Sequence, residues 1–238
     1  MKLLSYLKNY FTRAEIVLWA SSAALILISY LLFDRKNPLT LATSLIGVTF
    51  LILNAKGNPL GQLLTVVFSV LYGIISYSSA YYGEMITYLG MTAPMAVYAM
   101  AEWLRHPAQK GRAEVKVNRL GGREIARMLA LTALVTVLFY FILGYFHTAR
   151  LAVSTLSVTT SFLAVYLTAR RSAYFALAYA MNDAVLIALW ICASTDDISR
   201  LSVVICFAVF FVNDLYGFVN WRRMRGRQEG AAESSPRG

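Results

Sequence analysis

Residues 198–221 read ISRLSVVICFAVFFVNDLYGFVNW, an almost unbroken apolar stretch with Asn213 and Asp214 in its interior. As a helix rising 1.5 Å per residue, such a stretch covers about 36 Å, and the hydrocarbon core of a bilayer is roughly 30 Å thick. It therefore predicts a transmembrane helix. Polar side chains inside such a helix are costly and usually face the interior of a helix bundle.

The composition of the whole chain agrees with a membrane protein. Hydrophobic residues make up 58% of the 238 residues and charged residues 14%, with a mean hydropathy of +0.58. Soluble domains have roughly 45–50% and 25%. These values exclude a disordered chain, a secreted disulfide scaffold and a cytosolic enzyme. Cys192 and Cys206 lie in apolar stretches, where cysteine acts as a small hydrophobic residue.

The distribution of basic residues predicts how the chain crosses the membrane. Eight stretches are long and apolar enough to span it, at about residues 15–33, 37–54, 60–81, 84–104, 124–146, 151–169, 173–194 and 198–221. If they alternate in direction, one side holds only Arg35, Lys36, Arg150 and Arg200, which leaves 18 of the 22 Lys and Arg on the other. The positive-inside rule then places both termini in the cytoplasm.

The flanking segments need no further partner. Orientation and anionic lipid headgroups account for the basic loop at 105–127 and the basic tail at 222–227, so we expect no nucleic-acid partner. Residues 1–13 mix leucines with lysines, which is typical of an interfacial segment. The small polar residues at 228–238 predict a disordered end.

An internal repeat organises the spans. Lys56 and Arg170 are 114 residues apart, and both the Tyr72/Trp190 and the Trp103/Trp221 pairs are 118 apart. Three spans reverse direction and one linker span restores it, so the repeats are parallel, as in SWEET-like transporters. We therefore expect an all-α membrane protein with one extra N-terminal helix and a 3+1+3 bundle. Its parts are 1–36 (interfacial segment and extra helix), 37–104 (first repeat), 105–150 (basic loop and linker helix), 151–222 (second repeat) and 223–238 (disordered cytoplasmic tail).

Two Asn-Asp pairs reach the middle of the membrane from neighbouring helices. Asn182 and Asp183 lie ~14 Å from the cytoplasmic start of their helix, and Asn213 and Asp214 ~12 Å from the cytoplasmic end of the next. One pair alone indicates a hydrogen bond between helices. Two pairs at one depth favour a polar site, since transporter sites lie near the midplane.

Helical spacing adds an aromatic wall to this site. Asp183 and Trp190 are seven residues apart and share a face, as do Asn213, Gly217 and Asn220. A Trp above a carboxylate suits a flat cationic ring. In the first repeat, a stripe of Thr65, Ser69, Tyr72 and Ser76 either faces the same path or bonds back to its own helix.

Several of these stretches resemble the PnuC vitamin transporters. The resemblance covers about residues 39–104 and 151–222, and it rests on LYGIISY at 71–77, YYGE at 81–84, NDAVLIALW at 182–190 and, most specifically, NDLYGFVNW at 213–221. It implies uptake of nicotinamide riboside across a bacterial inner membrane by facilitated diffusion with alternating access. It also implies trapping of the substrate by phosphorylation in the cytoplasm, and a trimer.

The resemblance and the spacing together give the candidate site. We expect the substrate to be bound by Asn182, Asp183, Trp190, Asn213, Asp214, Asn220, Tyr72, Ser69 and Tyr179, without a metal or cofactor. The chain departs from the commoner members at four places: Phe68 replaces an Asn, Ala96 lies where a Gln is expected, Asp183 replaces an Asn, and Tyr179 replaces a Trp.

The acidic residues inside the spans and the positions of lysine and histidine bear on functions other than transport of nicotinamide riboside. An extra carboxylate at Asp183 leaves another cationic vitamin, thiamine, as an alternative, and Asp183 or Asp214 could be the proton site of a proton-coupled carrier. A sugar carrier gains little from carboxylates, and a scaffold protein has little use for them in the membrane. No lysine lies inside a span to hold retinal, and neither His106 nor His147 has a carboxylate or cysteine at ligand spacing, so we expect no enzyme.

Overall fold

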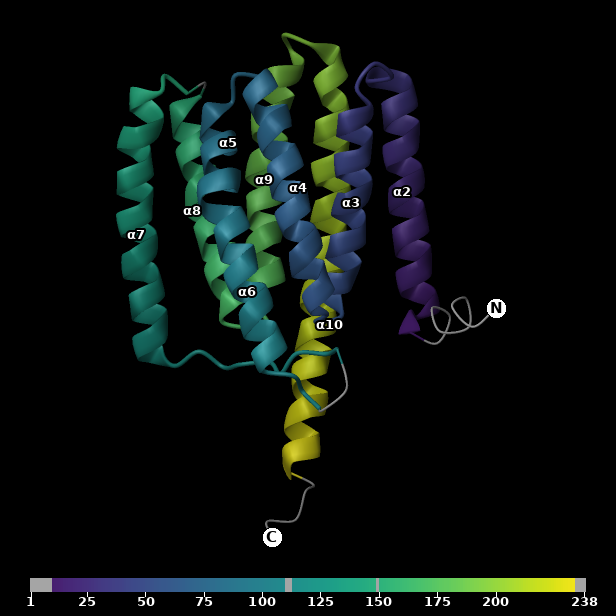
Figure 1. Cartoon of the computed structure of the whole chain (residues 1–238), viewed down its shortest axis with the longest axis vertical. Helices are drawn as coiled ribbons and strands as arrows, with labels where there is room; N and C mark the ends of the chain where they lie inside the picture. The colour runs from purple at the N-terminus through teal and green to yellow at the C-terminus, as the bar shows by residue number, and fades with distance from the viewer. Residues whose placement is uncertain (1–9, 110–112, 149, 234–238) are drawn as a thin grey trace.

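The computed structural model describes residues 10–109, 113–148 and 150–233, and most of them form long helices running side by side (Figure 1). The helices are α2 (Arg13–Phe33), α3 (Pro38–Ala55), α4 (Pro59–Ser78), α5 (Tyr82–Thr87), η1 (Tyr88–Thr92), α6 (Ala93–Arg105), α7 (Gly122–Tyr145), α8 (Leu151–Ala169), α9 (Phe175–Ser194), η2 (Ile198–Arg200) and α10 (Leu201–Glu233). Proline at the first turn starts α3 and α4, where its missing N–H costs nothing. The all-α prediction is thus confirmed.

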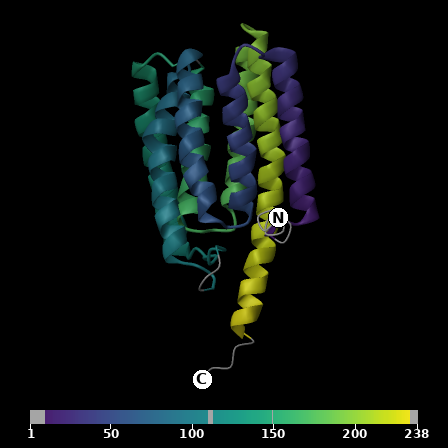
Figure 2. The ribbon, with the colours of Figure 1, turned by 45° about the vertical axis from the view of Figure 1, so that its right-hand side comes forward.

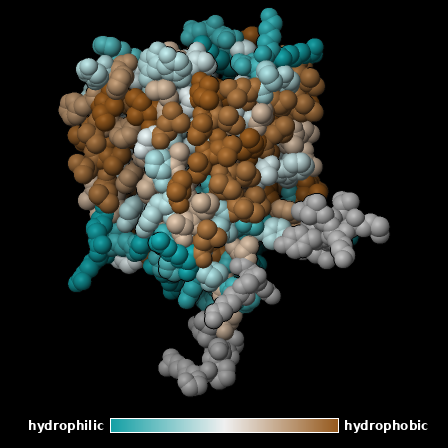
Figure 3. Space-filling model, viewed as in Figure 1, coloured by the Kyte–Doolittle hydropathy of each residue, from teal (hydrophilic) through white to brown (hydrophobic). Residues whose placement is uncertain are grey.

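Seven of these helices are long and apolar enough to cross a membrane: α2, α3, α4, α7, α8, α9 and the segment Ile198–Ala231 that contains α10. Apolar side chains form a broad band across the face shown in Figure 3, with hydrophilic residues gathered above and below it. Large apolar residues such as Leu32 and Phe141 are exposed on the surface. Lipid is the solvent that such a surface requires.

The segment from Tyr82 to Arg105 is helical along its length but is interrupted in the middle. Its central five residues, η1, form a π-helix, and the Ala93 N–H bonds to the Tyr88 carbonyl five residues earlier. Pro94 follows immediately, has no N–H to donate and crowds the preceding turn, so a local widening of the helix relieves the clash. Such π-turns occur frequently at functional sites.

Six helical elements pack in a closed ring. In order around it, α3 contacts α4, α4 contacts α6, α6 contacts α8, α8 contacts α9, α9 contacts α10, and α10 contacts α3. The remaining two long helices lie outside the ring at opposite ends of the bundle: α7 packs on α8, and α2 packs on α3 and α10 (Figure 1). The ring places the first set of three elements opposite the second.

The end of the bundle that carries the basic loop is held together by matching contacts. Gly57 after α3 and Arg171 after α8 adopt the left-handed conformation, with φ of 65° and 56°. The loop between α6 and α7 bonds to both turns: the Val115 N–H donates to Gly57 O at 3.0 Å, and the Asn118 N–H donates to Arg171 O at 2.9 Å. We call this end the basic end.

The C-terminal part of the chain differs from its predicted disorder. Instead of ending near Trp221, α10 continues as a helix to Glu233 and projects below the bundle (Figure 2). The extension is held by side chains: Gln228 accepts from the Val117 N–H at 2.9 Å, and Arg119 donates two 2.7 Å hydrogen bonds to Glu229. The expected disorder of 223–238 is therefore wrong for residues 223–233, because the basic loop gives the polar helix partners; 234–238 lie outside the described residues.

The N-terminal segment is described only in part. Residues 1–9 of the expected interfacial segment lie outside the described residues. Helix α2 begins after a capping box in which Thr12 and Glu15 bond to each other's backbone N–H. Glu15 is buried and also pairs with Lys56 at 3.1 Å, which fastens α2 to the end of α3.

Candidate functional site

The two aspartates predicted at mid-membrane meet in the structure. Asp183 on α9 and Asp214 on α10 are both buried, and their carboxyl groups lie close enough to interact electrostatically. Two ionised carboxylates side by side in an apolar interior repel each other, so this arrangement favours a proton on one of them. The second oxygen of Asp183, Oδ2, has no hydrogen-bond partner among the described residues. The pair therefore holds a free acceptor inside the bundle.

The neighbouring asparagines turn away from the aspartate pair. Asn182 Oδ1 accepts from Thr160 and Ser161 on α8, at 2.8 and 3.0 Å. Asn213 Nδ2 donates to Ser22 on α2 at 2.9 Å. Adjacent helical residues are 100° apart, so an Asn-Asp pair cannot direct both side chains to one face. Both asparagines thus fasten ring helices to their neighbours.

The predicted residue Asn220 lies far from the aspartates, at the basic end. Its Nδ2 donates to Ala55 O at 2.7 Å, which joins α10 to α3. Next to it, Trp221 Nε1 donates to Asn54 O at 2.8 Å, while Trp103 Nε1 donates to Thr168 O at 2.9 Å.

These two indole hydrogen bonds are reciprocal. Trp103 bonds α6 to α8, and Trp221 bonds α10 to α3, so each indole joins its own helix to a helix of the opposite set of three. Trp103 and Trp221 are both buried with ring centroids 5.3 Å apart, and Phe175 packs on Trp221 at 4.7 Å. We call these three residues the tryptophan latch, and it closes the bundle at the basic end.

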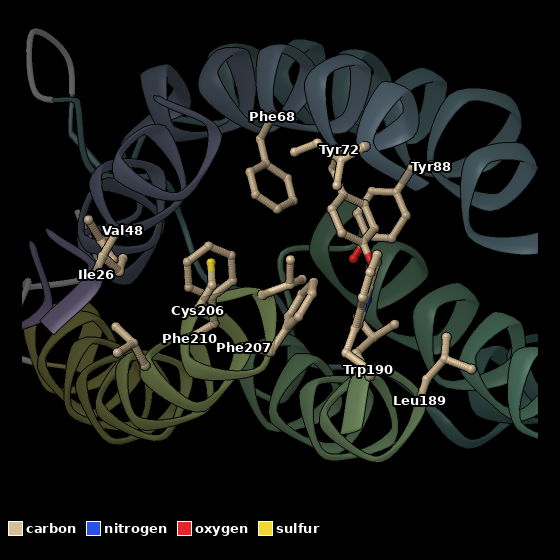
Figure 4. Packing of buried hydrophobic residues seen from close by; sticks show 14 of the residues in the cluster. Ile26, Val48, Phe68, Tyr72, Tyr88, Leu189, Trp190, Cys206, Phe207 and Phe210 are labelled. Atoms are coloured by element: carbon tan, nitrogen blue, oxygen red, sulfur yellow. The ribbon is translucent and has the colours of Figure 1, made fainter. Parts of the chain in front are cut away.

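Trp190 and Tyr72 join across the middle of the ring, toward the end opposite the latch. Trp190 Nε1 donates to the Tyr72 hydroxyl at 2.7 Å, and both side chains are buried. Figure 4 shows aromatic side chains of α4, η1, α9 and α10 pointing toward one another between the two arcs of helices. Tyr88 packs edge-on against Tyr72 at 4.4 Å, and Tyr81 against Trp190 at 5.1 Å. Tyr72 and Tyr81 therefore both contact the indole of Trp190.

Two further predicted residues have different roles. Tyr179 is one turn before Asp183 on α9, interacts electrostatically with both aspartates and so belongs to their surroundings. Ser69 is buried and donates to Thr65 O at 2.7 Å on its own helix. Thr65 likewise donates to Gly61 O at 2.9 Å. For these two hydroxyls, bonding back within the helix is what the structure shows.

The sequence reasoning missed a third buried acid. Glu84 on α5 is entirely buried, and neither of its carboxyl oxygens has a hydrogen-bond partner among the described residues. It interacts electrostatically with Tyr72 and Tyr88, and Tyr88 interacts in the same way with Asp183, so the aromatic cluster neighbours both acidic groups. In the sequence, Glu84 lies at the first position of the predicted span 84–104, where a charged side chain can usually reach water. Its place in the YYGE motif at 81–84 is the signal that could have pointed to it.

A small cavity reaches the aromatic cluster from the end opposite the latch. It measures about 180 Å³, and its lining includes Trp190, Asp34, Asp197, Ser199 and Arg200. Burial raises the pKa of Asp34, while hydrogen bonds from Ser199 lower the pKa of Asp197. This mouth is therefore polar and acidic, and it leads to one edge of the indole.

The comparisons with known proteins fit this geometry. Residues 37–223 match the family described as nicotinamide mononucleotide transporter. The chain belongs to this family. The match spans both sets of ring helices and leaves out α2, which packs outside the ring.

Two similar proteins both carry the name PnuC. The nicotinamide riboside transporter PnuC of Neisseria mucosa is 25% identical over 203 residues, which is 83% of this chain and 77% of that protein. A crystal structure described as the vitamin B3 transporter PnuC superposes with a TM-score of 0.81 at 21% identity, covering 92% of this chain and 94% of that one. This likeness shows the fold. The chain is thus a multi-pass membrane transporter of the PnuC type.

Proposed function

We propose that this protein carries nicotinamide riboside across the membrane through the centre of the six-element ring. The observation that supports the proposal is that the aspartate pair and the Trp190–Tyr72 pair lie one above the other in the interior of the bundle. The carboxyls of Asp183 and Asp214 meet at mid-depth, and Trp190 lies two helical turns above them beside Tyr72. A pyridinium ring stacks on an indole, and ribose hydroxyls donate to carboxylate oxygens such as the unpartnered Asp183 Oδ2.

Charge favours the riboside over its phosphorylated form. The family's description names the mononucleotide and the Neisseria relative's name gives the riboside. A phosphate needs lysine or arginine, and every Lys and Arg of the described residues lies in a loop, near a helix end or in the part of α10 beyond Trp221. Asp183, Asp214 and Glu84 instead supply three buried acids. Such a path attracts a cation and repels a phosphate dianion.

The fold supports an eight-crossing arrangement with parallel repeats. Helices α5, η1 and α6 together form the eighth crossing, because Tyr82–Arg105 is helical throughout and is as long as its neighbours. The ring order then pairs α3, α4 and α5–α6 with α8, α9 and α10. The reciprocal bonds of Trp103 and Trp221 are what a two-fold axis between two parallel repeats would produce.

Orientation follows from the charges. The basic end faces the cytoplasm by the positive-inside rule, with both termini on that side. The tryptophan latch is then the inner gate, and the mouth at Asp34 and Asp197 opens outward. Transport proceeds by opening the two ends in turn, as facilitated diffusion drawn inward by phosphorylation of the substrate in the cytoplasm. The protein acts as a trimer in the inner membrane of a bacterium.

A binding panel tests the proposal. Purified protein in detergent is titrated by calorimetry and thermal shift with nicotinamide riboside, nicotinamide mononucleotide, thiamine and a hexose. We expect binding of the riboside alone, lost in Trp190→Ala and kept in Trp19→Ala, a tryptophan on the outside of α2. Preference for thiamine would keep the site and change the substrate. Failure of every vitamin to bind would refute the function.

A proton-coupled carrier is the second candidate, because Asp183 and Asp214 lie side by side in the interior of the bundle, where two ionised carboxylates would repel each other. Uptake into proteoliposomes against a concentration gradient, driven by an imposed pH gradient, would support it. Uptake that only equalises the concentrations would support the facilitator.

A further inference from the structure

Glu84 is the one described acid that is wholly buried, lies away from the aspartate pair and has both carboxyl oxygens without a partner. Ser157 of α8 lies beside it, but its hydroxyl makes no hydrogen bond within the usual limits. A carboxylate left without donors or a counter-ion in an apolar interior is strongly disfavoured, so this packing suits a neutral carboxylic acid.

The groups around Glu84 supply no positive charge. The elements packed most extensively on α5 are α4, η1 and α8, and α7 contributes the apolar side chain of Leu143. They present Tyr72 from α4, Tyr88 from η1 and Ser157 from α8. No lysine, arginine or histidine of the described residues interacts with the carboxyl group, His147 at the α7–α8 turn included. A proton is therefore the cation that the closed arrangement needs.

Next to Glu84, helix α5 is in tight contact with its neighbours at Gly83, and a widened helical turn follows it. At Gly83, an added Cβ would lie 2.9 Å from Thr148 Cγ2 and 3.1 Å from Leu143 Cδ2, so α5 lies directly against the turn between α7 and α8. Movement of α5 away from this turn and from α8 would expose the buried Glu84 to water. The π-helix η1 lies directly after α5, and within it the Cβ position of Gly90 is nearly open. This is a place where α5 can tilt separately from α6.

We propose that Glu84 is a proton-binding site that controls the outer gate: bound proton keeps α5 packed against α8, and release of the proton opens this contact to outside water. The inference rests on the proposed transport function for its meaning. The carboxylic acid O–H bond breaks, the proton passes to outside water, and the carboxylate becomes hydrated. Because the proton leaves and returns on the same side, the site gates transport without driving it.

The test measures access to the α5–α8 contact without any substrate. A Thr148→Cys reporter is placed in a background with Cys192→Ala and Cys206→Ala, and its labelling by a membrane-impermeant maleimide is followed from about pH 5 to pH 9. The same reporter with Glu84→Gln corrects for ionisation of the thiol itself. We expect the ratio of the two labelling rates to rise several-fold with pH, by no more than tenfold per unit because one proton is released.

A ratio that stays constant over the whole range would overturn the proposal. If Glu84→Gln does not fold, Glu84→Met serves in its place, since it has similar length, no proton and no need of a partner. Adding Na⁺ at fixed pH separates the two cations: suppression of labelling by Na⁺ in the parent would show a metal-ion site and would also overturn the proposal. Because no vitamin is present, the result is independent of whether nicotinamide riboside binds.

Discussion

Replacement of either latch tryptophan by phenylalanine should open the basic end, and by the same amount. Trp221→Phe removes the 2.8 Å hydrogen bond to Asn54 O, and Trp103→Phe removes the 2.9 Å bond to Thr168 O. A hydrogen bond contributes about 0.5–1.5 kcal/mol net, and the smaller ring also loses part of an aromatic contact of about 0.5–1.5 kcal/mol. We therefore expect the closed end to lose about 1–2 kcal/mol, a factor of roughly 5–30 in its opening equilibrium.

The assay uses a buried reporter at the same end. Ala169→Cys lies next to Thr168, is 3% exposed, and is placed in a background with Cys192→Ala and Cys206→Ala. Its labelling rate by a maleimide is measured in vesicles whose basic end faces the medium. When opening is rare, the rate is proportional to the open fraction, so it should rise by about 5–30-fold in either variant.

A matched control separates the latch from general loosening. Trp19 Nε1 donates to Thr49 at 3.2 Å on the outer surface of the bundle, so Trp19→Phe also removes an indole hydrogen bond. It should leave the labelling rate unchanged. The two-fold reasoning would be refuted if one latch variant had an effect and the other had none, or if Trp19→Phe had the same effect as both.

Three further outcomes follow from other contacts. Tyr72→Phe leaves the buried Trp190 N–H without its acceptor and should lower the stability by about 1–3 kcal/mol, measured as a shift in the midpoint of denaturation in detergent; an unchanged midpoint would contradict the 2.7 Å bond. Gly57→Ala adds a Cβ at φ 65° and should cost about 1–2 kcal/mol in the same assay, whereas a neutral effect would mean that the turn relaxes. Asp34→Asn should flatten the pH dependence of stability: the folded pKa of this acid is raised by burial, so its native state binds the proton more tightly, and the stability gained at low pH is lost as pH rises through the folded pKa. Equal pH profiles for the parent and Asp34→Asn would show that its burial has no such effect.

Much of the fold could be predicted because each helix that crosses a bilayer needs about 20 mostly apolar residues, and such stretches are visible in the sequence. The predicted span at 151–169 coincides with α8, and 84–104 falls within the continuous segment Tyr82–Arg105. The helical extension to Glu233 could not be predicted, because its own composition is polar and its helix is held by Gln228 and Arg119 contacts with a loop more than 100 residues away.

Sequence reasoning could find polar residues of the candidate site that are costly to place in the membrane, but it could not find which helix each of them faces. Asp183 and Asp214 could be placed together because both lie at mid-depth on consecutive helices. Helical spacing also grouped Asn213 with Asn220, but spacing gives the shared face and not the helix that this face meets. The structure directs Asn213 to α2 and Asn220 to the end of α3.

The amino-acid sequence alone identifies a helical membrane protein, with polar pairs at one depth and basic residues concentrated on one side. These properties follow from the free-energy cost of placing each residue in lipid or in water. That cost depends on the type of residue and not on its packing partners. The packing of the helices in three dimensions was needed to show that Trp103 and Trp221 bond between the two sets of ring helices, that the two asparagines turn away from the aspartates, and that Glu84 has no hydrogen-bond partner among the described residues. Those properties depend on which surfaces meet, and helices far apart in the sequence supply them.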